Sequence, residues 1–173
     1  HATARAWGKV AVHAKSTPGF IVNRVARPYY AEALRVLGEG AADVATLDAV
    51  LREGCGFPMG PFELMDLIGH DVNFAVTSSV FDAYFQDKRF TPSLIQQELV
   101  LAGRLGRKSG AGWYRYDATG RRQTDPEVTA LIDSERARKG ITPRLFTPEE
   151  IQTRLIGAMA EEGVIYISST SKA

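Results

Sequence analysis

The stretch that decides the fold runs from Thr17 to Gly38 and reads TPGFIVNRVARPYYAEALRVLG. Its apolar side chains recur at the spacing that places them on one face of an α-helix. They are Ile21, Val25, Tyr29, Ala33 and Leu37, with Val22, Ala26 and Tyr30 beside them. A threonine followed by proline is typical of a helix start, because the N–H that proline lacks would be unpaired there anyway. The stretch predicts a helix that opens at Thr17, is kinked at Pro28, and is ended by Gly38 and Gly40.

Downstream, caps and glycines divide the chain into further helices. Their expected starts are Asp43, Pro61, Asp71 and Thr91. The third of these helices has side chains four residues apart that would share one face: Val72, Val76, Val80 and Tyr84. The succession predicts a compact helical unit over residues 16–117, which ends in a short extended segment or hydrophobic clasp at Trp113 to Tyr116.

Two flanking segments have a different character. Residues Lys9–Ala14 alternate weakly and predict a short strand, although no partner strand follows nearby. We therefore expect residues 1–15 to be the last strand and the junction of a sheet domain located elsewhere. Residues 118–146 are polar and charged, which predicts a linker or a loosely docked helix.

The segment from Thr147 repeats the opening of the first helix. Five identities occur at a constant offset, namely Thr17 with Thr147, Pro18 with Pro148, Ile21 with Ile151, Arg24 with Arg154, and Glu32 with Glu162. A shared Thr-Pro start in the same helical register predicts that residues 147–173 begin a truncated second copy of the unit. From Ile165 onward the sequence is β-prone and polar, so we expect an irregular end.

Composition and charge exclude several classes of function. The formal net charge is +1, with 45% hydrophobic and 24% charged residues, which is typical of a globular domain without a nucleic-acid or anionic-membrane surface. No apolar run is long enough to cross a bilayer. The single cysteine, Cys55, excludes an internal disulfide framework and favours a reducing cytoplasm. His13 and His70 have no partners at metal-ligand spacing, so no metal site is expected.

The glycine-rich segment Gly110-Ala111-Gly112 begins like a dinucleotide-binding fingerprint and then departs from it. Arg115 stands where the third glycine would be, and the segment leads into Trp-Tyr-Arg-Tyr instead of a helix. We therefore expect no cofactor-binding residues in this chain.

Three stretches resemble the carboxy-terminal domain of the 3-hydroxyacyl-CoA dehydrogenases. They are Thr17-Pro-Gly-Phe-Ile-Val-Asn-Arg24, Gly56-Phe-Pro-Met-Gly-Pro-Phe-Glu-Leu64 with Asp66, and Gly106-Arg-Lys-Ser-Gly-Ala-Gly-Trp-Tyr114. Their order and separations resemble the family across residues 16–117. The resemblance implies an all-α bundle of the 6-phosphogluconate dehydrogenase C-terminal-like type, and the partial second copy is similar to members with two such domains in tandem.

The resemblance also implies a function for the whole protein. The expected reaction is the NAD-dependent oxidation of an (S)-3-hydroxyacyl-CoA to the 3-ketoacyl-CoA, in fatty-acid β-oxidation or in phenylacetate and other aromatic-acid degradation. The nucleotide-binding domain of the family supplies the base and the NAD site, so this chain alone is expected to be inactive. The resemblance assigns a catalytic, substrate-orienting amide to Asn23, whose equivalent in the second copy is Thr153.

Substrate-lining residues and partners follow from the same resemblance. Pro58, Met59, Gly60 and Pro61 would line the acyl side of a cleft between domains. The family pairs through its helical domains, which implies a homodimer through helical faces. Two alternatives stay open: a stand-alone helical dimerisation or interaction module without catalysis, and a related dehydrogenase acting on another hydroxy acid.

Overall fold

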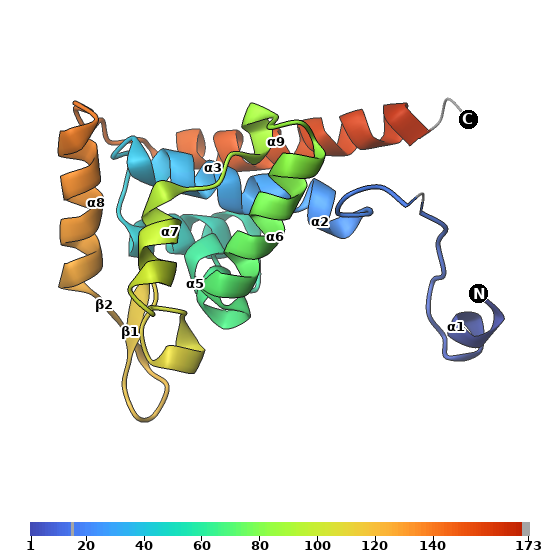
Figure 1. Ribbon diagram of the computed structural model, residues 1–173, viewed down its shortest axis with the longest axis horizontal. Coiled ribbons are helices and arrows are strands. Elements are labelled where there is room, and N and C mark those ends of the chain that lie inside the picture. The colour runs from blue at the N-terminus through green and yellow to red at the C-terminus, as the bar shows by residue number, and fades with distance from the viewer. Residues whose placement is uncertain (15, 171–173) are drawn as a thin grey trace.

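The computed structural model describes residues 1–14 and 16–170, so residue 15 and residues 171–173 of the predicted end segments lie outside it. The described chain is predominantly helical, which confirms the predicted all-α class (Figure 1). Its α-helices are α1 (Ala2–Ala6), α2 (Val22–Val25), α3 (Arg27–Gly38), α4 (Val44–Ala49), α5 (Pro61–Ile68), α6 (His70–Ala83), α7 (Leu94–Leu101), α8 (Pro126–Arg138) and α9 (Pro148–Thr170). Shorter turns are the π-helical Val50–Gly54 and the 3-10 turns Lys88–Phe90 and Arg107–Ser109.

The first helix begins later than the sequence predicts. Gly19 and Phe20 have φ angles of 76° and 48°, so the chain makes a left-handed turn after Pro18 and the helix starts at Val22. The break at Ala26 between α2 and α3 confirms the expected kink, because Pro28 has no N–H to continue the ladder. Helix α3 ends at Gly38, as predicted.

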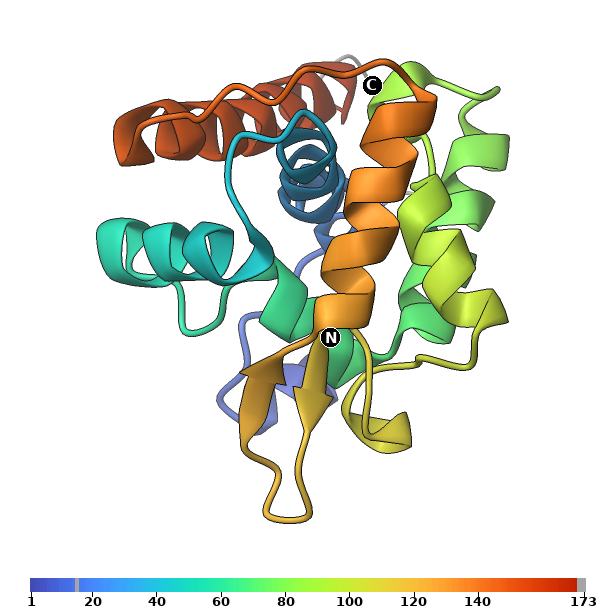
Figure 2. The ribbon, with the colours of Figure 1, turned by 90° about the vertical axis from the view of Figure 1, so that its left-hand side faces the viewer.

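The predicted strand at Lys9–Ala14 is wrong. These residues follow the short helix α1 without regular structure, and Figure 1 shows them apart from the helical body. A strand requires a hydrogen-bonding partner. Within the described residues the one sheet is the antiparallel hairpin of β1 (Tyr114–Tyr116) and β2 (Arg122–Thr124), which projects beyond α8 in Figure 2.

Helix α6 buries a different face from the expected valine stripe. Val80 is buried, but Val72 is 48% exposed, and the other buried positions after His70 are Asn73 and Thr77. The Thr77 hydroxyl donates to the Asn73 carbonyl, and the Asn73 side chain accepts from Gln96. Hydrophobic periodicity missed this face because its buried members are mostly polar, with hydrogen bonds that come from Arg27 of α3 and Gln96 of α7.

One hydrophobic core extends from α3 to α9. Leu37, Leu47 and Phe62 lie in it with Trp113. Further apolar members come from the last two helices, namely Val128 and Ile132 of α8 and Ile151 and Leu155 of α9.

The interval 118–146 is more ordered than a linker. It contains β2 and α8, which is packed on the core. The connection from α8 to α9 is also fixed, because the Phe146 N–H donates to the Ala41 carbonyl over 3.0 Å. Helix α9 continues to Thr170, so the irregular end expected from Ile165 is wrong for Ile165–Thr170, and Ser171 lies outside the described residues. The start of a second unit at residue 147 stays a prediction.

Candidate functional site

Asn23 lies on the short helix α2 with its side chain exposed to solvent. The left-handed turn at Gly19 and Phe20 brings the chain back against the helix. A Cβ atom on Gly19 would stand 3.1 Å from the backbone N of Arg24, so the turn packs tightly beneath Asn23. The next residue, Arg24, is buried, and its Nε donates to Glu162 over 2.7 Å. Asn23 is therefore an exposed amide on a backbone segment that is anchored on both sides.

The turn at residues 57–61 is held by Tyr29 of α3. The Tyr29 hydroxyl donates to the Met59 carbonyl over 2.8 Å, and its ring lies 4.8 Å from the ring of Phe57. The turn therefore rests on the helix that continues from α2, the helix of Asn23. The helical spacing of Tyr29 predicts only that its ring is buried, and does not indicate that its hydroxyl holds the turn.

Asp48 fixes the other side of this turn. Its carboxylate accepts hydrogen bonds from the backbone N–H groups of Phe62 and Glu63 over 2.9 and 3.0 Å. Asp48 belongs to α4, so the cap of α5 comes from another helix. A Cβ atom on Gly60 would stand 2.2 Å from the Asp48 carboxylate, which only glycine allows. Burial raises the pKa of Asp48 to about 6.

The predicted lining residues thus fall into two groups. Gly60 and Pro61 are buried and shape the start of α5, whereas Pro58 is exposed and Met59 is half-buried. Pro61 is the first residue of α5, as predicted. Only Pro58 and Met59 present side-chain surface that a ligand could reach.

The glycine-rich loop closes on Asp66 of α5. The Asp66 carboxylate accepts from the backbone N–H groups of Trp113 and Tyr114 over 2.8 and 3.0 Å, and from the Tyr116 hydroxyl over 2.8 Å. A Cβ on Gly112 would stand 2.1 Å from the same carboxylate. The glycine is required by this close approach, and a buried carboxylate occupies the place that a diphosphate would need. The loop residues do not fit a dinucleotide.

A buried polar chain continues from Asp66 into the bundle. His70 lies 2.8 Å from Asp66 through Nε2, and Gln96 bridges His70 and Asn73 over 3.3 and 3.1 Å. His70 is fully buried, in agreement with a structural role. Asp66 lies near the end of α5 and His70 begins α6 after Gly69, so this pair links two successive helices.

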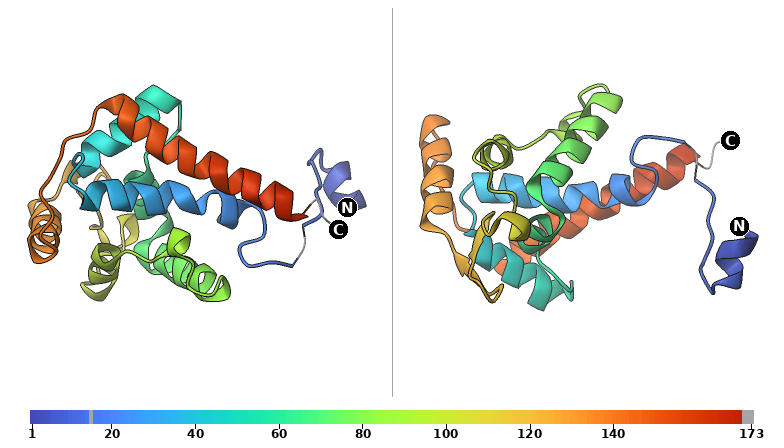
Figure 3. Two further views of the ribbon diagram at one scale, coloured as in Figure 1. Left: turned by 90° about the horizontal axis from the view of Figure 1, so that it is seen from above. Right: turned by 60° about the horizontal axis from the view of Figure 1, so that its bottom comes forward.

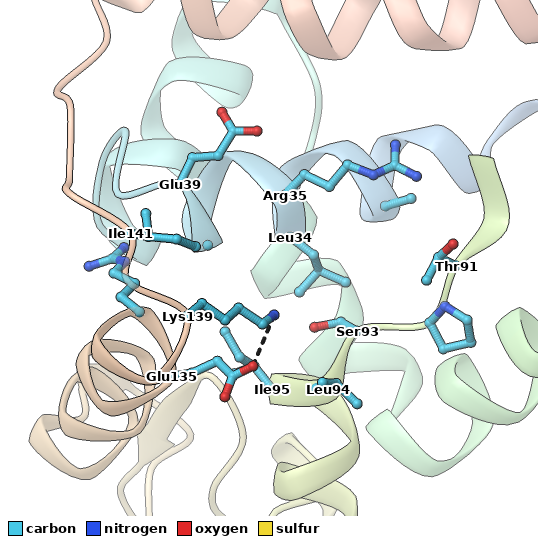
Figure 4. Close-up of a pocket in the computed structure, with 14 residues that line it drawn as sticks. Leu34, Arg35, Glu39, Thr91, Ser93, Leu94, Ile95, Glu135, Lys139 and Ile141 are labelled. Atoms are coloured by element: carbon cyan, nitrogen blue, oxygen red, sulfur yellow. Dashed lines mark ion pairs between the residues drawn. The ribbon is translucent and has the colours of Figure 1, made fainter. Parts of the chain in front are cut away.

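The cavity drawn in Figure 4 lies away from Asn23 and the 57–61 turn. It has a volume of about 360 Å³ and lies between α3, the segment before α7 and the end of α8. Leu34, Ile95 and Ile141 give it an apolar lining, and an ion pair of 2.9 Å between Lys139 and Glu135 lies along one side. It contains none of the predicted site residues, so Asn23 and the turn at 57–61 stay predictions of the sequence.

Two classes of site were also sought within the described residues. No three His, Cys, Asp or Glu side chains gather there as a metal site would need. No helix in that part of the chain combines the length and apolar character needed to cross a membrane.

The family model for the carboxy-terminal domain of 3-hydroxyacyl-CoA dehydrogenase matches residues 19–116. The chain is 51% identical over 163 residues to the 3-hydroxyadipyl-CoA dehydrogenase of Escherichia coli strain K12, covering 94% of this chain and 32% of that protein. The chain spans about a third of the length of this relative and of two others, from Caenorhabditis elegans and Sus scrofa.

The described fold is similar to that of solved structures from Escherichia coli and C. elegans, among others. A crystal structure of 3-hydroxybutyryl-CoA dehydrogenase from Escherichia coli K12 aligns with a TM-score of 0.66 and 60% identity, covering 72% of this chain and 26% of that one. The dehydrogenase part of multifunctional enzyme 1 from C. elegans aligns with a TM-score of 0.71 and 21% identity, covering 97% of this chain and 36% of that one. This second likeness concerns the fold alone, and it extends over nearly the whole chain.

Proposed function

The chain belongs to the 3-hydroxyacyl-CoA dehydrogenase family, as a carboxy-terminal domain, and we propose that it forms one wall of the substrate cleft in such an enzyme. The whole protein would oxidise an (S)-3-hydroxyacyl-CoA to the 3-ketoacyl-CoA. NAD would accept the hydride, and it would be bound outside this chain, because the loop at Gly110–Gly112 is closed on Asp66. The chain by itself would then be inactive.

The observation that carries the proposal is the placement of Asn23. Its amide is exposed, while the neighbouring backbone is fixed by the Gly19 turn and by the buried side chain of Arg24. An amide can both donate and accept a hydrogen bond, so it can hold the reacting hydroxyl and the thioester region in one orientation. Such positioning contributes to rate only where the amide itself is held in place.

The 57–61 turn supplies the second part of the proposed wall. Pro58 and Met59 would contact the acyl chain, since they are its accessible members. Gly60 and Pro61 would contribute the shape of the wall through their fixed backbone. Tyr29 would hold the turn at a fixed distance from Asn23. It lies on α3, which follows α2, and its hydroxyl donates a hydrogen bond to the turn.

The wider setting of the protein is part of the same proposal. The name of the E. coli relative, 3-hydroxyadipyl-CoA dehydrogenase, favours aromatic-acid degradation such as that of phenylacetate, with fatty-acid β-oxidation as the other setting. A single half-buried cysteine suits the cytoplasm. The helical domain would also provide the surface for homodimer formation.

The proposal is tested in the full-length enzyme with 3-hydroxyacyl-CoA substrates of different chain length. Asn23→Ala should lower turnover on the order of a hundredfold, because one positioned polar contact typically contributes about 2–4 kcal/mol to a transition state. Asn23→Asp should be comparably poor, since a carboxylate cannot donate the hydrogen bond. The matched control is Thr153→Ala, an exposed position at the equivalent place on α9, which should keep wild-type turnover.

Thermal unfolding of each variant separates catalysis from folding. We expect unchanged unfolding temperatures, because Asn23 is exposed. A well-folded Asn23→Ala enzyme with wild-type turnover would remove this residue from the site.

A further inference from the structure

The cavity of Figure 4 exists because the last turns of α8 carry no large apolar side chain. The buried residues of α8 are Val128 and Ile132, whereas residues 134–139 read Ser-Glu-Arg-Ala-Arg-Lys. Leu34 of α3 and Ile95 of α7 therefore line a space of about 360 Å³ that α8 leaves unfilled. Protein interiors are otherwise closely packed, so a space of this size between three helices indicates a place for a ligand.

This cavity is separate from the proposed substrate wall. Figure 3 shows α8 lying across the end of α3, at the opposite end of the molecule from α1. Asn23 lies on α2, which precedes the other end of α3. A ligand beneath α8 would therefore not touch Asn23, and an inference about it goes beyond the proposed function without resting on it.

The inner lining of the cavity is apolar. It is formed by Ala31 and Leu34 of α3, Ile95 of α7, and Ile141 of the segment that follows α8. The volume is near the lower limit of the roughly 300–1,000 Å³ that is usual for small-molecule sites. The cavity therefore suits a compact apolar body, and it is too small to enclose a coenzyme A thioester.

The acidic side chains at the cavity are already paired with cations. Glu135 accepts from Lys139 over 2.9 Å and from Arg138 over 2.8 Å, so two positive charges share one carboxylate. Glu39, which also lines the cavity, forms an ion pair with Arg154. The rim of the cavity therefore has an excess of positive charge.

Lys139 keeps hydrogen-bonding capacity for a ligand. Figure 4 shows its side chain extended across the cavity toward Ser93. An ammonium group has three N–H donors, and within the described part of the chain its one acceptor is Glu135. Arg35 adds a second positive charge at the rim, held in place by Glu32 and by two backbone carbonyls. Together these groups favour an anion over a cation or a neutral molecule.

We propose that this cavity binds a small monocarboxylate with a compact apolar body, of about the size of a medium-chain fatty acid. The apolar body lies against Leu34 and Ile95, and the carboxylate accepts a hydrogen bond from Lys139 Nζ at the rim. Such a ligand contacts α3, α7 and α8 at once. Its binding therefore stabilises the packing of the last turns of α8 against the other two helices.

A titration of the isotope-labelled 173-residue chain with octanoate tests the proposal by nuclear magnetic resonance. The amide signals of Leu34, Gly38 and Ile95 should shift and saturate, with a Kd of about 1 mM or below for a ligand of this size. Octan-1-ol provides the uncharged match. It should bind about fivefold more weakly or worse, because it lacks the charge that Lys139 recognises.

Two lysine variants test the charged end of the site. Lys139→Gln should weaken octanoate binding by about fivefold or more and leave octan-1-ol binding unchanged. Lys108→Gln is the matched control, because both lysine side chains are 46% exposed and Lys108 is paired with Asp71 outside the cavity. It should bind octanoate as the wild type does.

Two glycine variants test the apolar part. Gly38 lines the cavity, and a Cβ atom added to it would meet open space, so Gly38→Leu should fill the cavity and abolish the binding of both ligands. Gly157→Leu is the matched control on α9, where an added Cβ atom also meets open space. It should leave both affinities unchanged.

Several results would overturn the proposal. They are the absence of saturable octanoate binding in the millimolar range, equal affinities for octanoate and octan-1-ol, or shift changes centred outside α3, α7 and α8. Thermal unfolding establishes that each variant is folded, and Lys139→Gln decides the matter if Gly38→Leu is unstable. None of these measurements uses enzymatic activity, so their failure leaves the proposed role of Asn23 untouched.

Discussion

The Tyr114 hydroxyl donates a hydrogen bond of 2.7 Å to the Asp48 carboxylate, in the interior of the domain. This bond joins the β1–β2 hairpin to the end of α4, and the same carboxylate caps α5. The backbone of Tyr114 meanwhile donates to Asp66. One tyrosine therefore ties the third family stretch to Asp66 and, through Asp48, to the second stretch.

The raised pKa of Asp48 predicts a specific pH dependence of stability. The folded-state pKa is about 6 against an ordinary value of 3.8, so the folded protein binds the proton more tightly than the unfolded chain does. Protonated Asp48 therefore adds on the order of 3 kcal/mol to the free energy of unfolding. This stabilisation is complete below about pH 4 and is lost as the pH rises through 6. Urea unfolding between pH 4 and 7 should show this fall in the wild type but not in Asp48→Asn.

The comparison of wild type with variant isolates this one group. Other carboxylates act in the opposite direction, for instance Glu135, whose pKa is held at about 2 by Arg138 and Lys139. Tyr114→Phe provides a second control, because the lost hydrogen bond had lowered the pKa of Asp48, so the fall should move to higher pH. Equal pH profiles for wild type and Asp48→Asn would refute the assignment.

Two glycine-to-alanine substitutions should change the free energy of unfolding in opposite directions. A methyl group on Gly112 would collide with the Asp66 carboxylate, so Gly112→Ala should lower the free energy of unfolding by about 3 kcal/mol or more. Gly157 lies within α9, and a Cβ atom added to it would meet open space. Gly157→Ala should therefore raise the free energy of unfolding by about 0.5–1 kcal/mol. Chemical denaturation of the two variants measures both, and a stable Gly112→Ala would contradict the close packing on Asp66.

Removing the Tyr29 hydroxyl should loosen the 57–61 turn. Tyr29→Phe keeps the ring contact with Phe57 but leaves the Met59 carbonyl without this donor. The expected loss is about 1 kcal/mol of unfolding free energy, with faster amide exchange confined to the turn. Exchange that rises throughout the chain, or nowhere, would count against a local role for this bond.

The isolated chain should not reduce NAD with any 3-hydroxyacyl-CoA. Its glycine-rich loop is closed on the Asp66 carboxylate. Absorbance at the wavelength of reduced nicotinamide provides the measurement, with the full-length enzyme as the positive control. Turnover by the chain alone would show that the active site is complete within it.

Local chemistry in the sequence predicted several helix ends, although the helix expected to start at Thr91 begins at Leu94 with Ser93 as its cap. Asp43 caps α4 through its side chain, Pro61 opens α5, and Gly38 ends α3, as their residue types predict. Each signal depends on a few neighbouring residues, which is why it could be recognised without the fold. The late start at Val22 escaped prediction because Phe20 takes a left-handed conformation that its residue type disfavours.

Long-range contacts could not be predicted in the same way. The capping of α5 by Asp48 and the closure of the glycine loop on Asp66 join distant parts of the chain. Nothing adjacent to Asp48 in the sequence marks it as a cap. The strand predicted at Lys9–Ala14 is wrong for a related reason. Alternation of apolar and polar residues does not by itself supply a partner strand. The residue roles at Asn23, Pro58, Met59, Gly60 and Pro61 stay predictions.

The anchored connection before α9 has a consequence for how this long helix docks. Because the Phe146 N–H is bonded to the Ala41 carbonyl, α9 is presented to α2 and α3 at an effective concentration of roughly millimolar or above. An α9 that opens therefore returns by a step within one chain. Its docking should be insensitive to dilution, and should be controlled by whatever loosens this single intramolecular tether.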